Sequence, residues 1–231
     1  MGNSAQWRDD FPMSLWEKRF ISLLIVGAIV VPSPPAQAAE SKAVVVLETL
    51  SVKGRAPKTG YTRAQFGPSW SDVDRNGCDT RNDILTRDLT EIIYREGTRN
   101  CIVLSGVLVD PFSGEVIAFT RGVSTSSEVQ IDHSVALSDA WQKGAQQLSA
   151  DKRKAFANDP LNLMAVKGRL NSQKGDGDAA TWLPPLKSYR CAYVARQIAV
   201  KAKYSLWVTL AEKNAMASIL SKCPQQLIPK G

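Results

Sequence analysis

His133 is the only histidine in this chain of 231 residues, and it follows directly on an aspartate, Asp132. The two lie within residues 129–137, where apolar side chains alternate with other residues as they do along a half-buried strand. A neutral imidazole can take a proton from water, and a carboxylate can bind a hard cation. The pair therefore suits a general base beside a metal ligand, although an isolated Asp-His pair also occurs in ordinary surface turns.

The N-terminal segment has the order of features found in a secretory signal peptide. Lys18 and Arg19 precede an apolar run at residues 20–31, which is too short for the ~20 residues that a membrane-spanning helix needs. Ala36 and Ala38 then supply a small-x-small cleavage pattern. We expect cleavage after Ala38 and a mature protein that is exported to the extracellular space or cell envelope, with no membrane span.

The mature chain carries the whole net charge of +7, because three basic and three acidic residues balance in residues 1–38. A basic exported protein suits a polyanionic partner, with nucleic acid first and cell-wall polymer or lipid surface behind it. The length predicts one domain at residues 61–231, preceded by an N-terminal arm at residues 39–60, and we expect a monomer.

Four cysteines allow three pairings, and export favours disulfides over free thiols. We favour Cys78 with Cys101 and Cys191 with Cys223, since each pair closes a short loop between neighbouring elements. A zinc site is disfavoured because the chain has no C-x-x-C spacing and its one histidine is remote from all four cysteines.

The hydrophobic pattern predicts an α+β fold. Strands at residues 91–95, 101–109 and 115–121 should form an antiparallel meander that supplies the core, and the His133 strand should pair with a strand at residues 161–166. Helices are expected at residues 41–50, 80–89, 138–148, 150–157, 167–176, 188–203 and 208–221, of which the last two should form a disulfide-linked hairpin.

One acidic loop follows the spacing of a calcium site. Its oxygen-bearing side chains are Asp72, Asp74, Asn76 and Asp83, and Gly77 stands at the sixth position. The alternative is an acidic turn that caps the helix beginning near Thr80.

Two further groups of charged side chains have plain structural readings. The breaker-rich loop at residues 53–60 could touch phosphates but is more typical of a solvated surface loop. Arg190, Gln197 and Lys201 share one face of a predicted helix, and a solvated face is again the favoured reading.

Asp132 and His133, followed by Asn162 before the second strand and Asn171 in the next helix, resemble the motif of HNH nucleases. More narrowly, residues 60–223 resemble secreted HNH-family proteins related to the C-terminal domain of GmrSD-type restriction endonucleases. The resemblance also covers residues 77–83 and 201–204. The sequence departs from the His-Asn-His pattern that gives the family its name, because Asn171 occupies the position of the second histidine.

This resemblance implies a ββα-metal (His-Me) finger at about residues 129–176, embedded after the meander. His133 would be the general base, Asp132 and Asn171 would hold Mg²⁺ or Mn²⁺, and Asn162 would hold the loop of the histidine in place. Neighbouring cations would contact phosphates: Lys167, Arg169 and Lys174.

The expected function is that of a secreted, divalent-metal-dependent endonuclease acting on DNA, with double-stranded DNA as the expected partner and RNA as a further substrate. Little sequence preference is expected, because no element is built to read base edges in a major groove. The alternative is a non-catalytic exported protein that binds extracellular DNA or anionic wall polymer.

Overall fold

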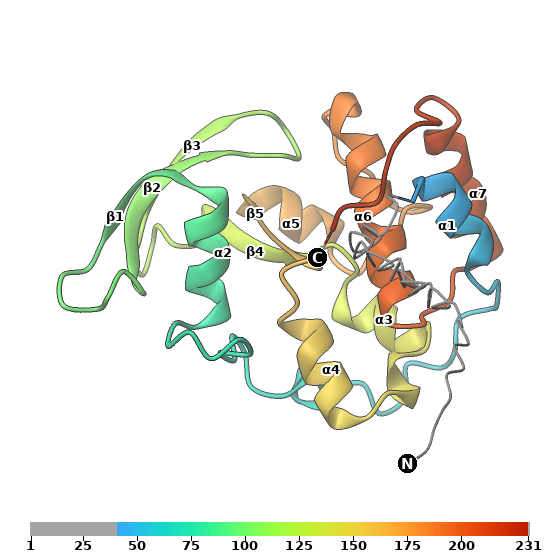
Figure 1. Ribbon diagram of the computed structural model, residues 1–231, viewed down its shortest axis with the longest axis horizontal. Helices are drawn as coiled ribbons and strands as arrows, with labels where there is room; N and C mark the ends of the chain where they lie inside the picture. Colours follow the sequence, from blue (N-terminus) through green and yellow to red (C-terminus); the bar gives the residue numbers. More distant parts are fainter. Residues whose placement is uncertain (1–40, 231) are drawn as a thin grey trace, which may run out of the picture. The chain divides into compact units, whose positions relative to one another are not determined.

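A three-stranded antiparallel sheet in the order β1-β2-β3 lies at one side of the fold (Figure 1). Its strands are β1 (Thr90–Tyr94), β2 (Val103–Val109) and β3 (Val116–Thr120), which confirms the predicted meander. The computed structural model describes residues 41–230, so the predicted signal peptide lies outside the described residues. Within those residues no helix is both long and apolar enough to cross a membrane.

Helix α2 (Thr80–Asp88) packs against β2 of this sheet and against β5. Asp79 caps its N-terminus by accepting a hydrogen bond from the backbone N–H of Asn82, as a short acidic side chain does at this position. The disulfide between Cys78 and Cys101 links the start of α2 to the segment before β2 and confirms the first predicted pairing.

A second, two-stranded antiparallel sheet carries the histidine. Strand β4 (Val129–His133) pairs with β5 (Leu163–Lys167), and helix α5 (Gly168–Lys174) follows β5 without a loop and contacts both strands. Gly168 is needed at this junction, because a Cβ there would lie 1.9 Å from the carbonyl oxygen of Ser127. The order of strand, insertion, strand and helix therefore agrees with the prediction.

The C-terminal helices form the other side of the fold (Figure 1). Helix α6 (Arg190–Lys203) packs against helix α7 (Leu210–Leu220), as the predicted helix pair should. The disulfide between Cys191 on α6 and Cys223, just after α7, confirms the second pairing. A complete capping box at Thr209 and Glu212 fixes the start of α7.

Helix α1 (Ala43–Thr49) packs against α6 and α7, with Ala43 and Leu47 fully buried. The described residues belong to one compact unit, and the described part of the predicted N-terminal arm shares a hydrophobic cluster with the C-terminal helices. An isolated β-bridge between Val52 and Val208 also links the segment after α1 to the residues just before α7.

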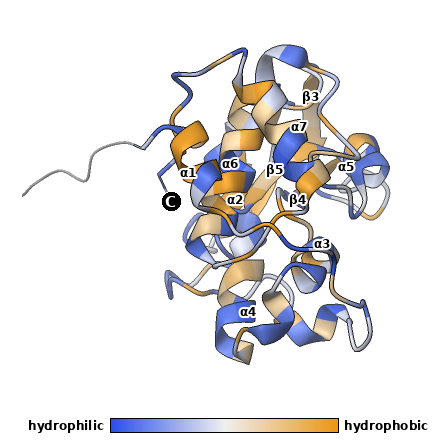
Figure 2. Cartoon of the chain, turned by 90° about the vertical axis from the view of Figure 1, so that its right-hand side faces the viewer, coloured by the Kyte–Doolittle hydropathy of each residue, from blue (hydrophilic) through white to orange (hydrophobic). Residues whose placement is uncertain are grey.

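Short helices complete the insertion between β4 and β5. They are α3 (Leu137–Gln142), η2 (Ala145–Gln147) and α4 (Ala150–Ala157), with the break at Gly144 that the sequence predicts. Helix α4 is mostly hydrophilic on its outer side (Figure 2), buries Phe156 and contacts the 3-10 helix η1 (Arg63–Phe66).

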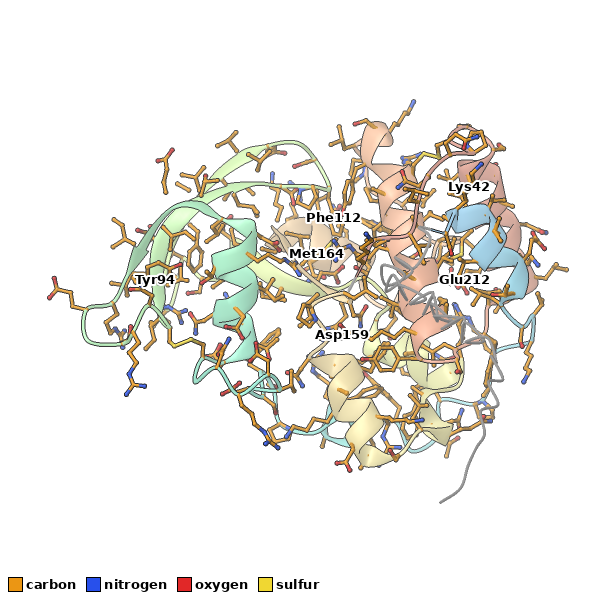
Figure 3. The ribbon with its side chains drawn as sticks, in the orientation of Figure 1. Lys42, Tyr94, Phe112, Asp159, Met164 and Glu212 are labelled. Carbon is orange, nitrogen blue, oxygen red and sulfur yellow. A yellow bond between two sulfur atoms is a disulfide. The ribbon has the colours of Figure 1, made fainter. Side chains whose placement is uncertain are left out.

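The meander does not supply the core by itself, contrary to the prediction. Its residues share one of three hydrophobic clusters, while the cluster that joins α1, α6 and α7 includes Phe112 and Met164 (Figure 3). Strands β1 and β3 expose apolar side chains, with Ile93 60% and Val116 71% exposed. The sheet is therefore covered on one face only.

A buried network of charges connects these parts, and it overturns the solvated reading of the helix face that carries Gln197 and Lys201, whereas the loop at 53–60 is largely exposed, as expected. Lys143 and Lys201 have no exposed surface, and the Nζ of Lys143 lies 2.6 to 2.7 Å from three carboxylates. The members of the network are Arg55, Asp139, Lys143, Asp178, Lys201 and Glu212. Lys201, from the predicted solvated face, therefore serves as an internal counter-ion, while Arg55, whose side chain is 36% exposed, pairs with Asp139 and Asp178 from the surface loop at 53–60.

Candidate active site

His133 is the last residue of β4 and is 8% exposed. Its Nε2 lies 2.9 Å from the carbonyl oxygen of Ala157, at the end of α4. Because a carbonyl can only accept, Nε2 carries the proton, and Nδ1 is left with a free lone pair. The fold thus selects the tautomer in which Nδ1 can accept a proton.

Burial lowers the pKa of His133 from 6.5 to about 4, against the opposing effects of the Ala157 hydrogen bond and the Asp132 carboxylate. The imidazole is therefore neutral at physiological pH. A neutral ring is the protonation state that a general base requires.

Asp132 precedes the histidine and is 4% exposed. Its Oδ1 accepts a hydrogen bond of 2.9 Å from the Nζ of Lys174, which also donates to the carbonyl oxygen of His133 at 2.8 Å. The second carboxylate oxygen, Oδ2, is buried and has no hydrogen-bond partner among the described residues. A buried carboxylate oxygen without a donor is costly, and a cation is one way to satisfy it.

Asn171 lies on α5 and lines the same cleft as Asp132 and His133, a hollow of about 380 Å³. Its Nδ2 donates to the Oε1 of Gln130 at 2.8 Å, which leaves its Oδ1 available. The structure thus brings Asp132, His133 and Asn171 to one cleft. Within residues 41–230 no group of three or more His, Cys, Asp or Glu side chains is placed to hold a metal, so the donors here are one carboxylate and one amide.

Asn162 is fully buried beside the turn that follows His133. Its Oδ1 accepts from the backbone N–H of Val135 at 2.9 Å, and its Nδ2 donates to the carbonyl oxygen of the same residue at 3.3 Å. The backbone N–H of Ser134 donates to the carbonyl oxygen of Asn162 at 2.7 Å. These bonds fix the chain directly after the histidine.

The three predicted phosphate contacts lie in different surroundings. Arg169 is exposed, and Lys167 forms an ion pair with Glu115. Lys174 is 3% exposed, and its ammonium is directed to Asp132 and not to the surface, because α5 places it behind the carboxylate. Its position is that of a counter-ion inside the site.

Two further cations line the cleft, and they come from segments far from the Asp-His motif in sequence. Arg63 belongs to η1 and Arg81 to α2. Burial, with Arg121 nearby, lowers the pKa of Arg81, whose guanidinium donates to the carbonyl oxygen of Val129 at 3.2 Å. Neither arginine lies near the motif in sequence, so only the fold could place them beside it.

The acidic loop is held together by Asn76. Its side-chain amide donates to Asp74 and to Asp83, both at 3.1 Å, while Asp72 accepts from the backbone N–H of Gly77. The next acidic residue, Asp79, caps α2, as the alternative reading of this stretch expects. Calcium binding by Asp72, Asp74, Asn76 and Asp83 stays a prediction, and a Ca²⁺ titration of the melting temperature tests it.

Comparisons with known proteins give a family and a relative. Residues 79–219 match the family model described as "GmrSD restriction endonucleases, C-terminal domain". An "Uncharacterized secreted protein" of Arthroderma benhamiae is 38% identical over 195 residues, which cover 84% of this chain and 90% of that protein. No solved structure matches the chain.

Proposed function

Because this chain belongs to the family of the C-terminal domain of GmrSD restriction endonucleases, we propose that it is an exported, metal-dependent endonuclease that hydrolyses phosphodiester bonds of DNA. The description of its relative as secreted supports export, as do two disulfides, which persist in oxidising compartments. The remaining support comes from the cleft at the end of β4.

The observation that carries the proposal is the meeting of Asp132, His133 and Asn171 at one cleft. The donors fit Mg²⁺ or Mn²⁺, since both ions prefer hard oxygen ligands and keep several waters. Asp132 Oδ2 is the buried oxygen that lacks a donor, and Asn171 Oδ1 is the uncommitted amide oxygen. When bound there, the ion would act as a Lewis acid that stabilises charge on the phosphate and the leaving oxygen.

His133 is proposed as the general base. Its Nδ1 takes a proton from a water molecule as the water oxygen attacks the phosphorus, and the bond from phosphorus to the leaving sugar oxygen breaks. The Ala157 carbonyl holds the ring in the required tautomer through Nε2. The imidazolium that forms lies beside the carboxylate of Asp132, which favours the positive charge.

Asn162 and Lys174 are proposed as positioning residues. Asn162 fixes the turn after His133 through Val135, and Lys174 holds Asp132 and the backbone carbonyl of His133 together. Arg63 and Arg81 line the cleft and give it the positive potential that a phosphate backbone requires.

A plasmid-nicking assay with matched variants of α5 tests the metal site. Asn171→Ala removes the proposed amide ligand, and Gln173→Ala, an exposed position on the same helix, serves as the control. We expect cleavage that requires Mg²⁺, stops with EDTA, and falls at least tenfold in Asn171→Ala but not in the control. Cleavage that persists in EDTA, or equal activity of the two variants, would overturn the proposed site.

A DNA-binding protein without catalysis is the second candidate. The ion pair between Lys174 and Asp132 favours it, because a buried ammonium already neutralises part of the charge that a metal would use. It predicts salt-sensitive retention of DNA and no cleavage products at any Mg²⁺ concentration.

A further inference from the structure

A second pocket adjoins the cleft at His133. Its volume is about 240 Å³, and it lies between the segment at 63–70 and the end of α4. It shares His133, Arg63 and Trp70 with the cleft that contains Asp132 and Asn171. Pockets for whole drug-sized ligands begin at about 300 Å³, so this one suits a single small planar group.

Trp70 supplies an aromatic wall for this pocket. Its ring is nearly parallel to the imidazole of His133, with 16° between the planes and 6.4 Å between the centroids. Its backbone has a φ of 56°, which a bulky residue rarely adopts and which tends to mark functional sites. The hydroxyl and backbone N–H of Thr80 hold this turn by donating to the carbonyl oxygens of Ser71 and Trp70.

Asn158 lines the pocket and has an amide oxygen without a hydrogen-bond partner within residues 41–230. The residue is 1% exposed, and its Nδ2 donates to the carbonyl oxygen of Lys154 at 2.9 Å. Its Oδ1 is buried without a hydrogen-bond partner in the part of the chain that the structure describes. A buried amide oxygen of this kind is satisfied by a ligand that offers an N–H.

Arg63 stands at the rim that the pocket shares with the cleft. It is exposed, and its side chain makes no hydrogen bond or ion pair with any other residue in the range 41–230. A free guanidinium beside the catalytic histidine suits a phosphate oxygen, which it can bind in a bidentate manner.

These features together describe a site for a nucleotide whose base has left its stack. Aromatic rings stack on any of the four bases, and each base presents an N–H on its pairing edge. We propose that this pocket holds one unpaired nucleobase of the bound strand, stacked on Trp70 and hydrogen-bonded to Asn158, next to the phosphate at His133. The inference rests on the proposed nuclease function and adds that single-stranded or locally opened DNA is the preferred substrate, since a paired base must first be unstacked.

The test compares two fluorescein-labelled single strands in EDTA, where no strand is cut. One carries bases, and the other carries tetrahydrofuran spacers in their place, so that the phosphates are the same. Fluorescence anisotropy measures both affinities for the wild type, for Trp70→Leu, and for Ala64→Leu, which fills the pocket from an exposed lining position. Tyr94→Leu on β1 removes an aromatic ring that does not line the pocket and serves as the control (Figure 3).

We expect the wild type and Tyr94→Leu to bind the strand with bases about 5- to 150-fold more tightly than the spacer strand, the range that stacking of one base provides. Trp70→Leu and Ala64→Leu should each lose most of this difference, and Ala64→Leu carries the test if Trp70→Leu does not fold. Equal affinity of the wild type for both strands, or a full difference in a folded pocket variant, would overturn the inference.

The nuclease proposal fails separately from this one. If Mg²⁺ produces no cleavage while the two strands still differ in affinity, the base pocket stands and the catalytic role falls. If the wild type cuts DNA but binds both strands equally, the nuclease stands and the base pocket falls.

Discussion

Acid should destabilise this protein through His133 in particular. The pKa of His133 is about 4 in the folded protein and 6.5 in a solvated reference, because burial disfavours the charged ring. The folded state therefore binds fewer protons than the unfolded state between these two values. The stability that depends on the neutral ring is complete above about pH 6.5 and is lost as the pH falls toward about 4.

The size of this effect follows from the two pKa values. A shift from 6.5 to about 4 corresponds to ~3 kcal/mol over the full window, at 1.36 kcal/mol per pKa unit. Between about pH 7.5 and about pH 5 the loss is ~2 kcal/mol. For a domain of this size that amounts to a fall of about 4–8 °C in melting temperature.

The assay compares the wild type with His133→Gln, which keeps a polar side chain that does not titrate. Chemical denaturation in EDTA at several pH values gives the unfolding free energy of each, and the difference between the two proteins isolates His133 from the carboxylates. We expect the wild type to lose ~2 kcal/mol relative to the variant between about pH 7.5 and about pH 5. Parallel pH profiles for the two proteins would refute the reasoning, because His133 would then not be held neutral by burial.

Three further predictions concern the buried charge network, the C-terminal disulfide and the turn after His133. Lys143→Met should destabilise the protein by about 3–5 kcal/mol in urea denaturation, because three buried carboxylates then lack a cation that they share. The control is Lys213→Met, which removes an exposed ion pair with Glu48 and should change stability by less than about 1 kcal/mol. Replacing Cys191 and Cys223 by alanine should lower stability by about 4 kcal/mol, measured in the same way, because the disulfide closes a loop with a sequence separation of 32. Asn162→Ala should lower stability by about 1–3 kcal/mol and reduce the single-turnover cleavage rate, since it leaves the buried N–H of Val135 unpaired; an unchanged rate would remove Asn162 from the site.

Much of the fold is predictable from local pattern. The meander follows from alternating β-branched residues between turn signals, and helix α4 ends at Ala157, before Asp159 and Pro160, as the sequence indicates. Both disulfides follow from the short loops that they close between neighbouring elements. These features depend on residues close together in the chain.

The charged interior is not predictable in the same way. Lys201 lies on a helix face with Arg190, and such a face reads as solvated until another element covers it. Here α3 and α7 bring Asp139 and Glu212 against it, so the ammonium is fully buried. The sequence likewise predicts an exposed phosphate contact at Lys174, because its neighbours in sequence are polar. In the fold its ammonium instead contacts Asp132.

The candidate site also has a part that local sequence predicts and a part that only tertiary packing brings together. Asp132, His133 and Asn171 are predictable because the first two end strand β4 and the third lies on helix α5, in the order of a known motif. Arg63 and Trp70 lie more than sixty residues before the histidine, in a segment without a motif, and tertiary packing alone brings them to it. Residues that contact the substrate from a distant loop leave no signal in a single sequence.

The rate of DNA cleavage by the mature protein in Mg²⁺, compared with that of His133→Ala, tests the central claim most directly. The circular dichroism spectrum of each protein verifies that it is folded. We expect the wild type to cut plasmid DNA. Folded His133→Ala should cut it at least about a hundredfold more slowly, which is typical of the loss of a general base. A folded His133→Ala that cuts DNA at the wild-type rate would contradict the assignment of this cleft as the catalytic centre.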